Sequence, residues 1–245
     1  MNTLMDIARE TVEGFEVSEK PFVCKYCNRG FSKEKTLASH VCEQKRRWQQ
    51  EKDKHVQVGM QAYVRFFEKT QGSTRANNKT YGDFANSPYY NAFVKFGKHV
   101  MDIRAINTSK FIDWVIDNNI KLDQWTYDVH YQKYIDEHLR VESWQDAVSR
   151  SLKTMEVWAD EHEVQLNTYF FAGKLTKVCH DIVHGRVSSW VLFNCESGVN
   201  FLSKVNEEQL ALIYPYIDPD FWQKNFIKYH NETEIVKSAL KEAGL

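Results

Sequence analysis

The chain has 245 residues, of which 32 are basic and 33 acidic, and apolar side chains make up 42% of it. This composition is typical of a soluble globular protein with room for one sizeable core. No apolar run approaches bilayer length, and the start of the chain lacks a basic region followed by an apolar one, so we expect neither membrane insertion nor export.

Residues 1–20 are predicted to form an acidic leader. Before Lys20 the only base is Arg9, which stands against five acidic side chains, so the leader carries a net charge of about −4. Such a segment is typical of solvated, disordered chain. It could also lie across a basic surface while no polyanion is bound.

Residues 21–42 contain a spacing that is typical of a zinc site. Cys24 and Cys27 are separated by two residues, so on a tight turn both thiolates can bind one metal ion from the same side. A segment this short cannot bury enough apolar surface to fold alone, and metal–ligand bonds must replace the missing core. We expect a helix to carry His40 toward the metal.

The same stretch resembles the C2H2 zinc-finger family. It matches the spacing aromatic-x-Cys-x2-Cys-x3-Phe-x5-Leu-x2-His at Phe22, Cys24, Cys27, Phe31, Leu37 and His40. The resemblance implies a small ββα unit with a structural zinc ion. If the unit docks on duplex DNA as its relatives do, the helix positions that face base edges are Lys33, Lys35, Thr36 and Ser39.

The fourth ligand departs from the family spacing, because Cys42 follows His40 with only Val41 between them. Two residues on a continuous helix turn roughly 200°, so Cys42 can reach the same metal only if the helix ends or unwinds at Val41. We predict the ligand set Cys24, Cys27, His40 and Cys42, since thiolate is a good structural ligand for zinc. The alternatives are three protein ligands plus water, the distant His55, or cysteines that are ordinary buried thiols.

The cysteine usage also indicates a compartment. With three of the five cysteines assigned to the finger, Cys179 and Cys195 remain, which is typical of reduced thiols and not of a disulfide framework. We therefore expect an intracellular, cytoplasmic protein.

Residues 43–55 are predicted to form a basic helical connector. From Lys20 to Lys54 there are ten bases and four acids, a net charge of about +6. Lys45, Arg46 and Arg47 lie just beyond the zinc site, where they can contact phosphates without reading sequence. Trp48 could stack on an exposed base, although packing of the finger against the body is the more common use of such a residue.

Residues 56–245 are predicted to form an all-helical globular domain, so the expected fold class is mainly α. Apolar residues recur at intervals of three and four, most clearly over 142–163, and no strand pattern occurs outside the finger. The first body helix could continue the connector as one long rod. We expect a loop over 70–83 and helix starts at Ser87, Asn206 and Asp218.

A second metal site is a further possibility. His180 and His184 lie one helical turn apart, with Cys179 and Cys195 in the same region. With Asp181, the two histidines could also serve a metal-dependent nuclease. Flanking apolar residues favour packed, structural roles instead, and the chain has no Gly-rich phosphate loop, GxSxG or HExxH motif.

The layout of one amino-terminal finger and a helical body resembles small proteins of tailed bacterial viruses, which are mostly described by the finger alone. We predict a non-enzymatic, zinc-finger nucleic-acid-binding accessory protein that serves transcription or replication. DNA is the expected ligand and RNA the alternative, and the helical body would contact a protein partner. The rival hypothesis is a protein-docking or scaffold module whose zinc is purely structural.

Overall fold

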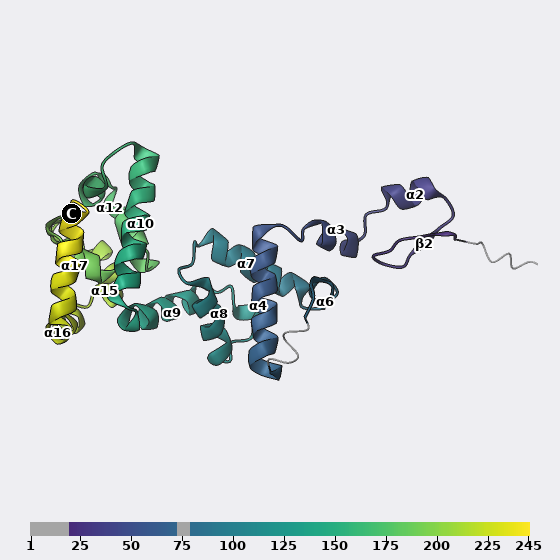
Figure 1. Ribbon diagram of the computed structural model, residues 1–245, viewed down its shortest axis with the longest axis horizontal. Coiled ribbons are helices and arrows are strands. Elements are labelled where there is room, and N and C mark those ends of the chain that lie inside the picture. Colours follow the sequence, from purple (N-terminus) through teal and green to yellow (C-terminus); the bar gives the residue numbers. More distant parts are fainter. Residues whose placement is uncertain (1–19, 73–78) are drawn as a thin grey trace, which may run out of the picture.

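A computed structural model of the chain describes residues 20–72 and 79–245. Within these ranges the protein is mainly helical, with one two-stranded antiparallel sheet near the amino end, which confirms the predicted fold class. Figure 1 shows three parts in chain order along the long axis: a small unit around β2 and α2, a middle group of helices, and a second group at the far end. The predicted acidic leader, apart from Lys20, lies outside the described residues.

The amino-terminal unit has the predicted ββα order. Strand β1 (Phe22–Val23) pairs with β2 (Gly30–Phe31), and α2 (Glu34–Ser39) follows. Phe22 lies opposite Phe31 in the sheet, and the Phe31 ring contacts the His40 ring with 4.7 Å between centroids. The aromatic residues therefore form a miniature core beside the predicted ligands.

The middle group packs around aromatic side chains. Helix α3 (Glu43–Gln49) links the amino-terminal unit to this group, which comprises α4 (Lys54–Gln71), α6 (Tyr81–Ala85), α7 (Tyr90–Asp102), α8 (Thr108–Asp117), the 3-10 turn η1 (Leu122–Gln124) and α9 (Asp128–Val141). Trp125 is fully buried at its centre. Helices α4 and α7 approach closely at Gly97, where an added Cβ would lie 2.1 Å from the His55 carbonyl oxygen. Only glycine permits that approach.

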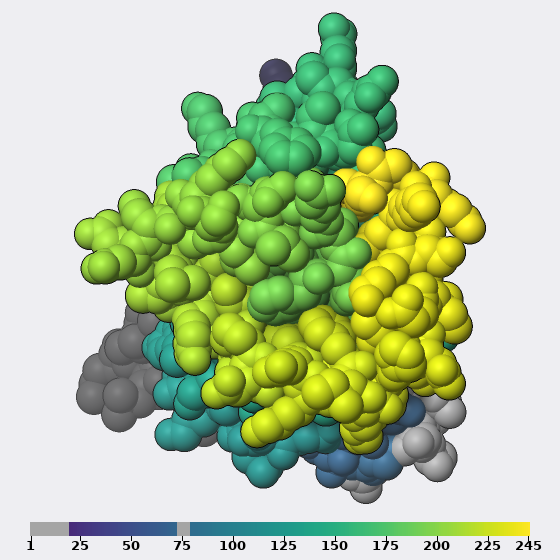
Figure 2. Space-filling model, turned by 90° about the vertical axis from the view of Figure 1, so that its left-hand side faces the viewer, coloured from purple at the N-terminus to yellow at the C-terminus, as the bar shows by residue number. Residues whose placement is uncertain are grey.

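The far group contains the rest of the chain. It comprises α10 (Trp144–His162), the 3-10 turn η2 (Leu166–Thr168), α11 (Tyr169–Ala172), α12 (Leu175–Val183), α13 (Ser189–Leu192), α14 (Glu196–Leu202), α15 (Glu207–Ile217), α16 (Pro219–Lys228) and α17 (His230–Glu242). Figure 2 views the molecule from this end, where these helices form a continuous surface. The predicted caps Asn206 and Asp218 are confirmed, since each side chain accepts backbone N–H bonds at its helix start.

The body has two cores where the sequence indicated one. Among the described residues, buried apolar side chains from α4 to α9 form one cluster and those from α10 to α17 form another, with Tyr216 packed against both. The composition of the whole chain could not reveal this division, because both groups are helical and similarly apolar.

The structure also corrects three local predictions. The connector does not continue into the body as one rod, because α3 ends at Gln49 and α4 begins at Lys54. The predicted loop over 70–83 is shorter than expected, because α4 continues to Gln71 and α6, which Thr80 caps, begins at Tyr81, while 73–78 lie outside the described residues. The helix expected from Ser87 begins two residues late, since Ser87 accepts the N–H of Tyr89 in a turn before α7.

None of the helices over 20–72 and 79–245 combines the length and apolarity that a bilayer crossing requires.

Candidate metal centre and its attachment to the body

The four predicted ligands converge on one point. One donor atom from each of Cys24, Cys27, His40 and Cys42 can be chosen so that all lie within 4.8 Å of one another. The Sγ atoms of Cys24 and Cys42 are 3.9 Å apart, and Cys27 Sγ lies 3.3 Å from His40 Nε2. An S–S distance of 3.9 Å is almost twice a disulfide bond, so the two thiols are separate ligands.

The first pair of ligands is held by a tight turn. The Asn28 N–H donates to the Cys24 carbonyl at 2.8 Å, and the Cys24 N–H donates to the Arg29 carbonyl at 2.9 Å. Asn28 has a left-handed backbone with φ of 56°, a conformation that asparagine tolerates better than most residues. This turn brings Cys27 back beside Cys24.

The second pair depends on a broken helix, as the spacing of His40 and Cys42 requires. Helix α2 ends at Ser39, and His40 already has an extended backbone with φ −69° and ψ 122°. The break therefore comes one residue earlier than predicted, and His40 follows the helix instead of lying on it. An extended segment allows the two side chains to turn to the same metal.

Cys42 has a second role as the N-cap of α3. Its Sγ accepts the Lys45 backbone N–H at 3.3 Å. The Lys45 ammonium donates to the His40 carbonyl at 3.1 Å, which satisfies a carbonyl in the extended segment. The metal ligands and the start of α3 are thus parts of one local structure.

The donor set suits zinc. Three thiols and one imidazole are the ligands of closed, tetrahedral structural zinc sites. Burial raises the pKa of the Cys24 thiol, but hydrogen bonds from the backbone at Cys27 and Tyr26 outweigh it and lower the pKa to about 7. A thiol that ionises near neutral pH is ready to bind a metal. The ligand residues are therefore positioned to bind a metal ion, consistent with a structural zinc.

The predicted nucleic-acid contacts differ in availability. Lys33, Lys35, Thr36 and Arg46 are exposed. Ser39 is exposed too, but its hydroxyl donates to the Lys35 and Thr36 carbonyls of its own helix. Lys45 is half-buried and holds the His40 carbonyl.

Arg47, a predicted phosphate contact, joins α3 to the middle helices. Its Nη1 donates to the Ala85 carbonyl at 2.7 Å, its Nη2 pairs with Glu43, and its guanidinium lies 4.5 Å from the centre of the Tyr90 ring. These contacts engage both terminal nitrogens of the guanidinium, so Arg47 is less available for a phosphate than the exposed Arg46.

Trp48 attaches the finger to the body, as its packing alternative predicted. The indole lies 5.2 Å from the Tyr81 ring at the start of α6 and 6.4 Å from the Tyr26 ring of the finger. The Tyr81 hydroxyl also donates to the Arg47 carbonyl. Tyr81 could not be recognised as a contact from the sequence, because it follows a polar stretch without helical periodicity.

The possible second metal site around His180 and His184 does not form among the described residues, where the finger provides the only group of potential metal ligands. Cys179 and Cys195 are buried in the core of the far group. Asp181 accepts from Tyr169 and pairs with Lys177 and Arg186. Cys179, Cys195 and Asp181 therefore have the structural roles that the flanking apolar positions indicated.

No family model matches the chain, and neither a curated protein nor a solved structure does. The likeness to zinc fingers therefore rests on the ligand geometry and the ββα order. The resemblance of the layout to viral proteins receives no support from these comparisons.

Proposed function

We propose that the protein is a zinc-stabilised nucleic-acid-binding accessory protein whose finger contacts the phosphate backbone, with DNA as the expected ligand. The observation that carries the proposal is the charge of the finger surface. Over 20–42 the five basic side chains are all exposed, and the single acidic residue is Glu34. With three thiolates and one Zn²⁺ ion, the unit keeps a net charge of about +3.

The binding is electrostatic more than sequence-specific. Helix α2 has six residues and a length of about 9 Å, which is short for reading several base pairs in the major groove. Among the predicted base contacts, the Ser39 hydroxyl donates to a carbonyl of α2, whereas the side chains of Lys33 and Lys35 are exposed. Lysines on a rigid metal-bound unit supply affinity, and a partner bound to the helical body would supply the choice of site.

The proposed role is one of binding and not of catalysis, in support of transcription or replication. The far helical surface in Figure 2 is large and separate from the finger, so a protein partner there would leave the basic residues free. A bound partner could then be delivered to the nucleic acid.

The test is the salt dependence of binding to a short DNA duplex, measured by fluorescence anisotropy with zinc-loaded protein. If Lys20, Lys25, Arg29, Lys33, Lys35 and Arg46 all contact phosphates, the plot of log K against log salt has a slope no steeper than about −5. Changing Lys33, Lys35 and Arg46 to Gln should reduce the slope by about 3.

The matched control changes three exposed lysines of the helical body, Lys98, Lys133 and Lys241, to Gln. The control lowers the net charge equally but should leave the slope unchanged. Binding without salt dependence, or an equal loss in the control, would contradict the proposal. A single-stranded RNA of the same length, measured in parallel, decides between DNA and RNA.

A protein-docking function is the second candidate, because the finger also has an apolar cavity of about 390 Å³. Val23, Leu37 and Ala38 line it, Lys25 and Lys45 lie at its polar side, and Val23 is 52% exposed. If a partner protein docks in this cavity, Val23→Glu should weaken its binding, and nuclease treatment should leave its binding unchanged. The substitution Lys33→Gln should leave such docking unchanged.

A further inference from the structure

A basic cavity lies where the two helical groups meet. It has a volume of about 240 Å³ and is bounded by the segment between α7 and α8 on one side and by α10 and α12 on the other. Five cationic side chains line it: Arg104, Arg150, Lys153, Lys177 and Arg186. The two lining carboxylates are Asp181 and Glu161.

The cations in this cavity are only partly neutralised. Lys177 and Arg186 both pair with one carboxylate, that of Asp181, which also accepts the Tyr169 hydroxyl at 2.6 Å. Two cations on one buried carboxylate leave a positive charge uncompensated. The buried Nε of Arg186 has no hydrogen-bond partner among the described residues. An anion in the cavity would offset the excess charge.

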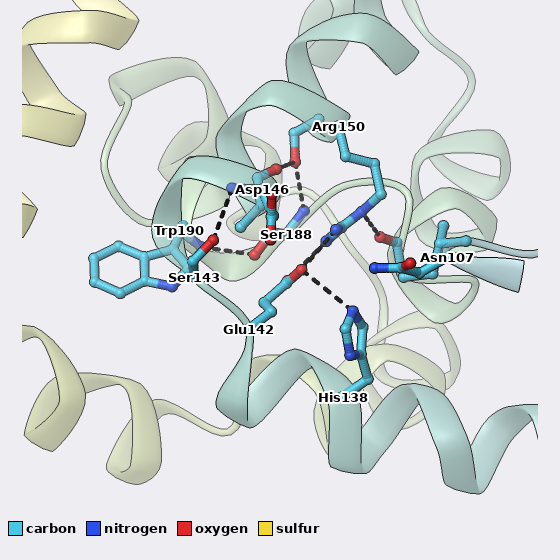
Figure 3. Close-up of polar contacts among 12 residues, drawn as sticks. Asn107, His138, Glu142, Ser143, Asp146, Arg150, Ser188 and Trp190 are labelled. Carbon is cyan, nitrogen blue, oxygen red and sulfur yellow. Dashed lines mark hydrogen bonds and ion pairs between the residues drawn. The ribbon is translucent and has the colours of Figure 1, made fainter. Parts of the chain in front are cut away.

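Arg150 is fixed at the inner wall. Its Nη1 and Nη2 donate to Glu142 at 2.6 and 2.7 Å, and its Nε donates to the Gly185 carbonyl at 2.6 Å. Figure 3 shows the guanidinium of Arg150 between the Glu142 side chain and the chain near Asn107. The Glu142 carboxylate neutralises Arg150 from the buried side, so Arg150 acts mainly as a rigid wall.

Arg104 contributes the least compensated charge. It forms no ion pair with the residues in the described ranges, and it is exposed at the cavity edge. Its backbone is left-handed, with φ of 48°, where glycine would be less strained than arginine.

We propose that this cavity binds the phosphate group of a small organic phosphomonoester. With Glu142 paired to Arg150 and Glu156 paired to Lys153, the cavity keeps an excess of about one positive charge, which favours an anion, and arginine is well suited to phosphate. Ile106 and Val157 give the cavity an apolar part that would contact the organic body. The volume is below the 300–1,000 Å³ or so of typical ligand pockets, which favours a small ligand. Since both helical groups line the cavity, a bound ligand would also hold them together.

The test uses the full zinc-loaded chain and isothermal titration calorimetry at constant ionic strength, with phenyl phosphate, inorganic phosphate and sulfate as probes. Phenyl phosphate should bind best, because it alone joins a dianion to an apolar body. If phenyl phosphate binds no more tightly than inorganic phosphate, the assignment of a monoester is overturned. No binding of phenyl phosphate would overturn the site altogether.

Three variants locate the binding. Arg104→Gly should weaken phenyl phosphate binding by about tenfold, while its melting temperature stays unchanged or rises because the left-handed backbone suits glycine. Glu161→Gln removes a repelling charge and should tighten binding by about threefold. Lys98→Gln, an exposed lysine of α7 outside the cavity, serves as the matched control and should bind like the wild type.

These outcomes separate a built site from general attraction to a charged surface. If Lys98→Gln weakens binding as much as Arg104→Gly does, the cavity is not the site. The same holds if Arg104→Gly stays folded and binds phenyl phosphate like the wild type.

Discussion

Replacement of Cys42 tests the most specific feature of the metal centre, the ligand that departs from the family spacing. Cys42 Sγ lies 3.9 Å from Cys24 Sγ and also accepts the Lys45 N–H at 3.3 Å. A serine at this position keeps an oxygen that can cap α3 but is a poor ligand for zinc, whereas an alanine loses both functions. The two variants therefore separate metal binding from helix capping.

The expected magnitudes differ between the two functions. Loss of residues that merely support a ligand costs about 10- to 100-fold in metal affinity. Loss of the ligand itself should exceed that, so we expect Cys42→Ser to weaken zinc binding by more than about 100-fold, or about 2.7 kcal/mol. The further change to alanine should remove about 1 kcal/mol more from α3 through the lost cap.

The assay is competition for zinc with a chromophoric chelator, together with the absorption spectrum of the Co²⁺ form, which reports the number of thiolate ligands. His55→Gln is the matched control, because His55 is the alternative fourth ligand and lies outside the group of four. It should keep the zinc affinity of the wild type. Wild-type zinc affinity in Cys42→Ser, or loss of zinc from His55→Gln, would show that Cys42 is not the fourth ligand.

Three further perturbations probe the body and the attachment of the finger. Burial lowers the pKa of His138 to about 4, so between about pH 6.5 and pH 4 the unfolded chain binds a proton that the folded chain does not. Stability should therefore fall by up to about 3 kcal/mol as the pH drops through this window, and urea titrations of His138→Gln should show a weaker fall. Gly97→Ala would place a Cβ 2.1 Å from the His55 carbonyl oxygen, so it should lower the free energy of unfolding by about 3 kcal/mol. Urea titration measures this loss, and a loss of less than about 1 kcal/mol would show that α4 and α7 can move apart at little cost. Trp48→Ala should leave zinc affinity unchanged but let the finger tumble independently in ¹⁵N relaxation, whereas joint tumbling would show that other contacts hold it.

The metal centre could be predicted from the sequence because its information is local. Two cysteines at a fixed spacing and a histidine after a leucine specify a ligand set within nineteen residues or so of chain, and the one irregular spacing required a helix break. The structure has that break at His40. The caps at Asn206 and Asp218 were predictable for the same reason, since a cap acts on N–H groups two or three residues away.

Long-range contacts could not be predicted in this way. Arg47 has the same side chain and nearly the same sequence surroundings as Arg46, yet its guanidinium bonds to the Ala85 carbonyl, 38 residues along the chain. Periodicity shows which face of a helix is apolar but not which helix covers it. The division into two cores and the cavity beside Arg104 depend on such pairings, so they emerged only from the three-dimensional arrangement.

The segment over 40–48 joins metal binding to the orientation of the finger. Its first residues, His40 and Cys42, are positioned to bind a metal ion, and Cys42 also caps the start of α3. Along α3, Arg47 and Trp48 contact the middle helices, whereas Arg46 between the ligands and these anchors stays exposed. Since the last ligand is also the helix cap, the direction of α3 is fixed by the same bonds that hold the metal. The basic residues of the finger are therefore held at a definite angle to the body only when all four ligands are in place.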